Sequence, residues 1–300
     1  MLENPILLRA KAFALHHCPY ACLAAGKALS NTVLFQNERA YLAGRFGSGC
    51  DLPSVVYFTT VRSGSQYVGG LIDRIYRSVG GESLRLQKYY FHGRTQEEHL
   101  GMERVSWLEQ NLKPQGFYYG PLSAPDGPFE GEGCKVVMGV RDPRDIMVSF
   151  FYSFAYAHTP ADRKFVLGSR EAREKGLEWF VRQPERIAKV KVDLGRLCEV
   201  REGKADVFCW RYEEMMGDFE GFLGSLVAHV AGGRCDDELM EVLLKEREES
   251  SKQGTREKEN LLAHRRSGKS GVFREKLSAE TVQFLNEEFG DILKHLDYQV

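Results

Sequence analysis

The stretch that decides the fold is Ser-Val-Val-Tyr-Phe-Thr-Thr-Val-Arg-Ser-Gly-Ser-Gln-Tyr, residues 54–67. Its first seven residues, 54–60, are mostly β-branched or aromatic, which predicts a short strand buried on both faces. A loop of small residues follows, and residues 67–79 have the apolar periodicity of a helix that ends at Gly80-Gly81. A strand, a tight loop and a helix in this order are typical of one unit of a parallel sheet.

Two further strands with following helices extend this pattern. Residues 135–140, Lys-Val-Val-Met-Gly-Val, predict a second buried strand, and residues 206–210 predict a third. Helices are predicted over 145–156, 219–230, 237–250 and 279–295. This alternation predicts an α/β protein with a central parallel sheet flanked by helices on both faces. Ligands of such sheets bind at the carboxyl ends of the strands, where the polar residues after the three strands would meet.

Length and charge limit the classes of protein. The 300 residues predict a single domain over 1–300, with residues 1–50 as a helical extension packed on it. Within that extension, residues 6–29 predict an amphipathic helix broken at Pro19. Lys and Arg number 41 against 42 Asp and Glu, so the net charge of −1 predicts no nucleic-acid partner. Any anion site must therefore be a local cluster of basic groups.

The distribution of apolar residues and cysteines bears on location. No run approaches the roughly 20 apolar residues that a membrane span needs, and residues 1–15 lack the order of a secretion signal. Seven cysteines at irregular spacing favour a reducing compartment over a disulfide framework or a zinc site. His16, His17 and Cys18 point in different directions on a helix and do not predict a metal site. We therefore expect a cytoplasmic protein without a transmembrane segment or a bound metal.

The loop after the first strand is a candidate anion site. Backbone N–H groups at the start of the following helix can bind an anion, and the helix dipole favours negative charge there. Gly64 allows the backbone to approach a ligand closely, Ser63, Ser65 and Gln66 add donors, and Arg62 adds a fixed positive charge. The alternative is an ordinary strand-to-helix turn with a solvated arginine.

The loop after the second strand offers another basic group. Arg141 would emerge at the end of the strand, and Ser149 follows eight residues later inside the helix, so both can face one phosphate. The same segment permits a second interpretation, in which Asp142 and Asp145 cap the helix and Arg144 pairs with them.

A third basic segment is His-Arg-Arg-Ser-Gly-Lys-Ser-Gly-Val-Phe, residues 264–273. Glycines allow tight turns there, and the Arg and Lys side chains suit a phosphate. It ends a polar stretch, residues 251–270, that predicts a long loop. A solvated basic loop is the alternative to a ligand-binding one.

These pieces, in this order, resemble the sulfotransferases that use 3′-phosphoadenosine-5′-phosphosulfate (PAPS). The family's K-S-G-T-T-W loop is similar to residues 62–67, and its R-[DN]-P-x-D-x-x-x-S-x-[YF] element is similar to residues 141–151. A Tyr-Glu-[DE]-Met segment matches residues 212–215, and the late R-K-G-x-x-G loop resembles residues 266–271. The resemblance covers residues 54 to about 275.

The resemblance implies a role for each matching position. Arg62 would contact the bridging and 5′-phosphosulfate oxygens, while Tyr67 and Tyr212 would approach the adenine. The 5′-phosphate would be bound by Ser63, Gly64, Ser65 and Gln66. The remaining cofactor contacts, mainly to the 3′-phosphate, would come from Arg141, Ser149, Arg266, Ser267 and Gly268. Residues 251–275 would form a loop that covers the cofactor.

The chain departs from the family pattern in two places. Arg62 replaces a lysine and cannot donate a proton at neutral pH, so its expected role is electrostatic. Cytosolic members carry a His in the strand before the 3′-phosphate arginine, but residues 116–121 contain none. The base would then come from the segment after the first helix. His92 is the first candidate, because residues 88–92 predict a strand whose end could face the sulfate; Glu82 and His99 follow.

The activity that the resemblance implies is in-line transfer of a sulfuryl group from PAPS to a hydroxyl or amine. The acceptor would be a small molecule, a lipid or a carbohydrate, and 3′-phosphoadenosine-5′-phosphate (PAP) would be released by a monomer or homodimer. Two alternatives stay open. One is a catalytically silent protein that binds PAP or PAPS. The other is an ATP-dependent P-loop kinase. The sequence disfavours it, because Gly268-Lys-Ser270 is not preceded by the glycine that a G-x-x-x-x-G-K-[ST] loop needs; Ala263 stands at that position.

Overall fold

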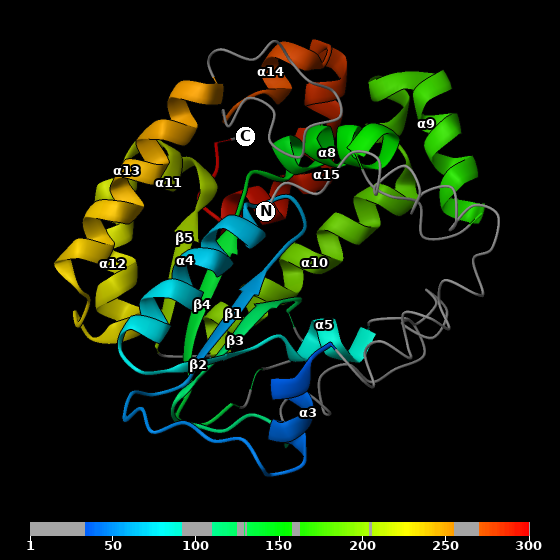
Figure 1. Ribbon diagram of the computed structural model, residues 1–300. Helices are drawn as coiled ribbons and strands as arrows, with labels where there is room; N and C mark the ends of the chain where they lie inside the picture. The colour runs from blue at the N-terminus through cyan, green and yellow to red at the C-terminus, as the bar shows by residue number, and fades with distance from the viewer. Residues whose placement is uncertain are drawn as a thin grey trace.

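The computed structural model describes residues 34–91, 110–124, 129, 131–157, 163–203, 206–254 and 270–299. At its centre lies a five-stranded parallel sheet in the order β2-β3-β1-β4-β5 (Figure 1). Its strands are β1 (Val55–Thr59), β2 (Glu82–Leu84), β3 (Phe117–Leu122), β4 (Lys135–Val140) and β5 (Val207–Arg211). Every pairing within the sheet is parallel, and helices follow β1, β2 and β4 before the next strand, as is usual for α/β proteins.

Helices cover both faces of the sheet (Figure 1). The described helices are α3 (Gln36–Leu42), α4 (Ser65–Ser78), α5 (Leu86–Phe91), α8 (Pro143–Tyr152), the π-helical turn η1 (Ser153–Ala157), α9 (Arg163–Val181), α10 (Pro184–Gly203), α11 (Tyr212–Gly217), α12 (Phe219–Ala231), α13 (Asp237–Gly254), α14 (Phe273–Lys276) and α15 (Ala279–His295). No helix within the described residues is long and apolar enough to span a membrane.

Alternating side chains of the central strand divide the core into two layers. Val55 and Tyr57 of β1 pack with apolar residues of α4 and α12 on one face. Val56 and Phe58 pack on the other face, with apolar residues of α8, α10 and α15. All four side chains are almost fully buried. The prediction of an α/β fold with helices on both faces is therefore confirmed.

The strand register places three loops at one edge of the sheet. Thr59, the last residue of β1, pairs with Gly139, and Val140 pairs with Arg211 at the end of β5. The residues that follow β1, β4 and β5 therefore leave the sheet at the same level. This is the carboxyl edge, where the sequence predicts an anion site.

Several predicted elements occur where the sequence indicates them. The strands at residues 54–60, 135–140 and 206–210 are β1, β4 and β5, and the helix predicted over 279–295 is α15. The helix expected to begin at Asp145 begins two residues earlier, at Pro143, because Asp142 caps it. Its expected end near Tyr156 is a π-helical turn, η1.

Two local predictions are wrong. Residues 88–92 were expected to form a strand, but α5 is a helix over Leu86–Phe91. Leu86 is fully buried, and α5 contacts β3, so tertiary packing outweighs the β-propensity of the aromatic residues. Helix α13 extends to Gly254, so the first four residues of the loop expected over 251–270 are helical.

The helix expected over residues 6–29, with His16, His17 and Cys18, lies outside the described residues.

Gly139 gives a test of core packing in β4, the strand between β1 and β5. A methyl group at this position would lie 2.5 Å from Cζ2 of Trp210 and 3.0 Å from the hydroxyl of Tyr57. We expect Gly139→Ala to lower the stability by about 1–3 kcal/mol through overpacking and to lower the midpoint of thermal unfolding.

The matched control is Gly70→Ala on α4, where a methyl group has no other atom within 4 Å. This position is exposed and helical, so we expect a gain of about 1 kcal/mol and a higher midpoint. Equal midpoints for the two variants would contradict the packing of Trp210 and Tyr57 against β4.

Candidate functional site

The loop between β1 and α4 has the conformation of an anion-binding turn. The hydroxyl groups of Thr60 and Ser63 lie 2.6 Å apart and close the turn. Gly64 is the N-cap of α4 with φ of 79°, and Arg62 has φ of 69°, a left-handed conformation that is uncommon outside glycine. The first turn of α4 presents amide groups that lack an intrahelical acceptor, as in any helix. Such a helix start favours a negatively charged ligand.

This loop contacts the turn between β4 and α8. Arg141 donates a hydrogen bond through Nη1 to the carbonyl oxygen of Arg62, at 3.0 Å. Arg62 in turn donates through Nε to the hydroxyl of Ser149, at 3.2 Å. The structure therefore brings together three residues that sequence analysis assigns to one ligand. Arg141 and Ser149 are both buried at this edge of the sheet.

Tyr212 completes the surroundings of Arg141. The guanidinium carbon of Arg141 lies 4.2 Å from the centre of the Tyr212 ring. A side chain at Gly64 would meet the same ring, since a Cβ built there would be 3.5 Å from it. This distance is an ordinary van der Waals contact, so glycine is favoured at position 64 by its positive φ and not by the nearness of Tyr212. The other aromatic candidate, Tyr67, packs against Phe219 of α12, with ring centres 6.0 Å apart.

The capping interpretation of the β4–α8 turn is correct for Asp142 and Arg144. The Asp142 carboxylate accepts a hydrogen bond from the amide of Arg144 and forms an ion pair with the guanidinium of Arg144, at 2.7 Å. Arg144 also donates to Asn286 on α15, at 2.7 Å, and to the carbonyl oxygen of Gln299, at 2.8 Å. Because Arg144 is bound to these groups, it stabilises the fold of this turn.

Asp145 connects this turn to the end of the third basic segment. Its carboxylate accepts hydrogen bonds from the amides of Gly271, at 2.7 Å, and Phe273, at 3.0 Å. Burial raises the pKa of the Asp145 carboxyl, although Arg141, 3.8 Å away, and the two amides oppose the shift. Asp145 is thus not a helix cap but the residue that fixes Gly271 and Phe273 beside Arg141. The candidate residues Arg266, Ser267 and Gly268 lie outside the described residues.

Glu213 is a half-buried carboxylate beside the same turn. It accepts a hydrogen bond from the hydroxyl of Tyr298, at 2.7 Å, and another from the amide of Asp142, at 3.3 Å. Burial raises the pKa of the Glu213 carboxyl, against the opposing effects of these donors and of Arg141. Sequence analysis missed Tyr298 because nothing in the local pattern of the C-terminal residues points to this turn.

The structure does not bring Glu82 to the anion-binding loop. Glu82 is the first residue of β2 and pairs with Phe117, the first residue of β3, so it lies at the amino edge of the sheet. Its carboxylate is 3.9 Å from Arg77. The other two candidates for the base, His92 and His99, lie outside the described residues.

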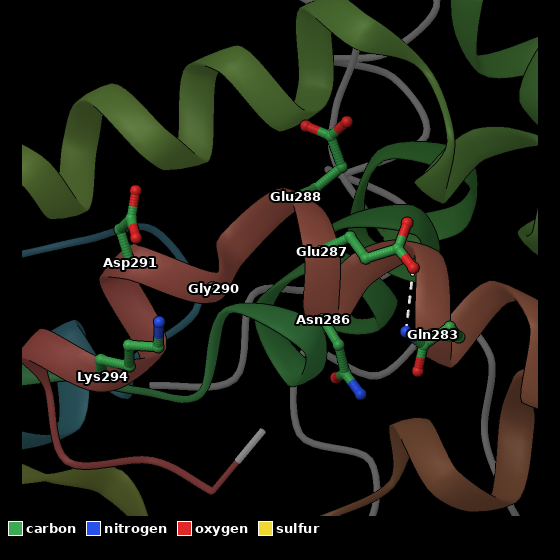
Figure 2. Close-up of a pocket in the computed structure, with 7 residues that line it drawn as sticks. All are labelled: Gln283, Asn286, Glu287, Glu288, Gly290, Asp291 and Lys294. Carbon is green, nitrogen blue, oxygen red and sulfur yellow. Dashed lines mark hydrogen bonds between the residues drawn. The ribbon is translucent and has the colours of Figure 1, made fainter.

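A hollow on α15 is a different kind of site (Figure 2). Its lining residues all belong to this helix: Gln283, Asn286, Glu287, Glu288, Gly290, Asp291 and Lys294. Three of them are carboxylates and one is a lysine, so the surface does not suit an anionic ligand. The hollow contains none of the candidate residues of the strand edge.

The arrangement was compared with known proteins. A family model described as sulfotransferase domain matches residues 53–297. No curated protein sequence matches the chain. Among solved structures, mouse sulfotransferase SULT7A1 complexed with PAP is 18% identical, with 81% of this chain and 85% of that chain covered and a TM-score of 0.44. Retinol dehydratase in complex with androsterone and the inactive cofactor PAP is 17% identical, with 87% of each chain covered and a TM-score of 0.45.

The family model covers the part of the chain that forms the sheet and the candidate site. The match begins just before β1 and ends after α15, so it contains the anion-binding loop, the β4–α8 turn and Tyr212. It extends over most of the chain, and it coincides with the α/β fold described above. This chain therefore belongs to the sulfotransferase domain family.

Proposed function

We propose that the chain transfers a sulfuryl group from PAPS to a hydroxyl or amine and releases PAP. The observation that carries the proposal is the contact of Arg62 with both Arg141 and Ser149, which joins two strand ends at the carboxyl edge. Two arginines beside a helix N-terminus suit a ligand that carries two anionic groups. Membership of the sulfotransferase family supports sulfuryl transfer in general.

The donor groups fit the two anionic ends of PAPS. In our proposal, Arg62 and the loop residues Ser63 to Gln66 bind the 5′-phosphosulfate, where the first turn of α4 adds amide donors. Arg141 and Ser149 bind the 3′-phosphate. The adenine would lie near Tyr67 and Tyr212, whose rings flank the Gly64 loop. Arg266, Ser267 and Gly268 are assigned to the cofactor through the family resemblance alone.

The proposed chemistry is one displacement at sulfur. The acceptor oxygen or nitrogen forms a bond to sulfur, the bond from sulfur to the bridging phosphate oxygen breaks, and the acceptor proton passes to a base. Arg62 stabilises the charge that grows on the leaving phosphate, since its guanidinium stays protonated. We keep His92, and after it His99, as the proposed base, because Glu82 lies at the opposite edge of the sheet.

The acceptor is proposed only as a class: a small molecule, a lipid or a carbohydrate. The aromatic run of residues 150–156 does not narrow this choice. Phe150 and Phe154 pack against Phe180, and Arg186 lies over these rings, with its guanidinium carbon 4.4 Å from the centre of Phe154. These aromatic side chains belong to the helical core.

A catalytically silent protein that binds PAP or PAPS is the second candidate. It is favoured by the sequence of β3 and its preceding glycine, residues 116–121, which lacks the histidine of cytosolic family members. PAP binding without transfer to any of a broad panel of acceptors would support this alternative.

Nucleotide specificity is the first test of the proposal. We expect PAP to raise the midpoint of thermal unfolding, while AMP, ADP and ATP have smaller effects. A ligand at 100 times its dissociation constant adds about 2.7 kcal/mol to the stability of the folded state. Stabilisation by ATP with magnesium, and none by PAP, would contradict the proposal and favour a kinase.

Arg62 is the residue whose loss should be most costly for transfer. We expect Arg62→Ala to lower the rate of PAP release from PAPS, with the best acceptor of a panel, by about 10²–10³. The control is Arg170→Ala on α9, an exposed arginine paired with Glu174, which should leave the rate unchanged. Transfer by Arg62→Ala at the wild-type rate would overturn the role of Arg62.

Asp145 should control the order of the segment that follows the third basic loop. Asp145→Ala removes the acceptor of the Gly271 and Phe273 amides, so we expect faster hydrogen exchange over residues 271–276. Asp218→Ala is the control, since Asp218 also accepts from a backbone amide, that of Gly221, but caps α12. Unchanged exchange over 271–276 in Asp145→Ala would contradict the role of Asp145.

A further inference from the structure

The residues after α15 lie against the edge of the proposed cofactor site. We call this segment, Leu296 to Gln299, the C-terminal tail. Besides backbone bonds to α15, three side-chain hydrogen bonds attach it: the Tyr298 hydroxyl donates to Glu213 at 2.7 Å, Arg211 donates to the carbonyl of Asp297 at 3.0 Å, and Arg144 donates to the carbonyl of Gln299 at 2.8 Å. Two of these bonds are to backbone carbonyl groups and hold the tail in place. In the remaining bond a side chain of the tail itself, Tyr298, is the donor, and its acceptor is a carboxylate next to the site.

The Glu213 carboxylate lies within the electrostatic reach of Arg141. Burial raises the pKa of the Glu213 carboxyl, and the positive charge of Arg141 opposes this shift. Glu213 also accepts the amide hydrogen of Asp142, the residue that follows Arg141, and it follows Tyr212, whose ring lies against the Arg141 guanidinium. A carboxylate in this position is a competitor of a phosphate for the same arginine.

Each oxygen of this carboxylate has its own donor. The Tyr298 hydroxyl occupies Oε2, and the Asp142 amide occupies Oε1. If the hydroxyl were removed, one oxygen of a half-buried carboxylate would lose its donor. An unsatisfied buried carboxylate is costly, and Arg141 is the neighbouring cation that could satisfy it.

We propose that Tyr298 is a positioning residue for the 3′-phosphate site: it holds the Glu213 carboxylate so that Arg141 stays available to the phosphate. The proposal rests on the proposed function, because it assigns the 3′-phosphate to Arg141. It gives the C-terminal tail a part in the selection of nucleotides that carry a 3′-phosphate over those that do not.

A positioning role and a purely structural role of Tyr298 predict different changes in nucleotide affinity. If Tyr298 only stabilised the tail, its loss would lower the affinity for every nucleotide to a similar extent. If it keeps Glu213 from Arg141, its loss lowers the affinity for PAP and spares AMP, which has no 3′-phosphate. The ratio of the two affinities therefore separates the two roles.

The test compares Tyr298→Phe with wild type by calorimetric titration of PAP and AMP into the full-length protein. We expect the ratio of PAP to AMP affinity to fall about tenfold, the size of one hydrogen bond to a charged group, with AMP affinity unchanged. Tyr76→Phe is the matched control. Tyr76 lies on α4, and its hydroxyl also donates a partly buried hydrogen bond, to the carbonyl of Pro53 at 2.9 Å. Its ratio should equal that of wild type.

A second substitution identifies the competing carboxylate. Glu213→Gln removes the charge and keeps the shape of the side chain, so Tyr298→Phe combined with Glu213→Gln should regain the PAP preference. Failure of the double variant to regain it would overturn the inference. Should Tyr298→Phe not fold, Glu213→Gln alone decides: a ratio at or above wild type is expected, and a lower ratio overturns the inference.

The outcomes separate the inference from the proposed function. Wild-type protein that binds PAP no better than AMP would refute the 3′-phosphate site, and the inference with it. Wild-type protein that prefers PAP, together with an equal preference in Tyr298→Phe, would refute the role of Tyr298 alone.

Discussion

The pairing of four charged side chains in the turn between β4 and α8 is the constraint on which the rest of the site depends. Arg141, Asp142, Arg144 and Asp145 follow one another within five residues, and all four are buried. Buried charges are destabilising unless each has partners. Asp142 and Arg144 pair with each other, so the energetic problem is solved locally for one pair. Arg141 and Asp145 lie 3.8 Å apart, and their hydrogen-bond partners come from other parts of the chain, which are thereby held at the turn.

Those partners make one site from segments far apart in the sequence. Arg141 holds the loop after β1 through the carbonyl of Arg62, and Asp145 holds Gly271 and Phe273, which lie more than 120 residues away. The same turn therefore positions the first anion-binding loop and the end of the third basic segment. This explains how three modest sequence signals can belong to one ligand site.

How much the sequence could predict depends on how local the determining interactions are. Strand β1 is buried on both faces, so its continuous apolar pattern is informative, and the same holds for β4. The edge strand β2 has only three residues, two of them partly exposed, and carries no such pattern. The proximity of Arg62, in the loop after β1, to Ser149, in α8, was predictable because each lies at a short, fixed spacing from a strand end. The Tyr298–Glu213 contact spans 85 residues and has no local signal.

The partners of each arginine also decide which interpretation of the β4–α8 turn applies to it. Arg144 donates to a carboxylate at 2.7 Å and to two further acceptors, so a phosphate could displace these bonds only at a large cost. Arg141 lies against a carbonyl, an aromatic ring and a carboxylate at 3.8 Å, and these are weaker competitors than a phosphate at hydrogen-bond distance. The capped-helix interpretation therefore holds for Asp142 and Arg144, and in the proposed function Arg141 is the arginine that meets the 3′-phosphate. If the proposed function is correct, selectivity for the 3′-phosphate depends less on the number of basic residues than on the groups that keep the carboxylates of this turn occupied.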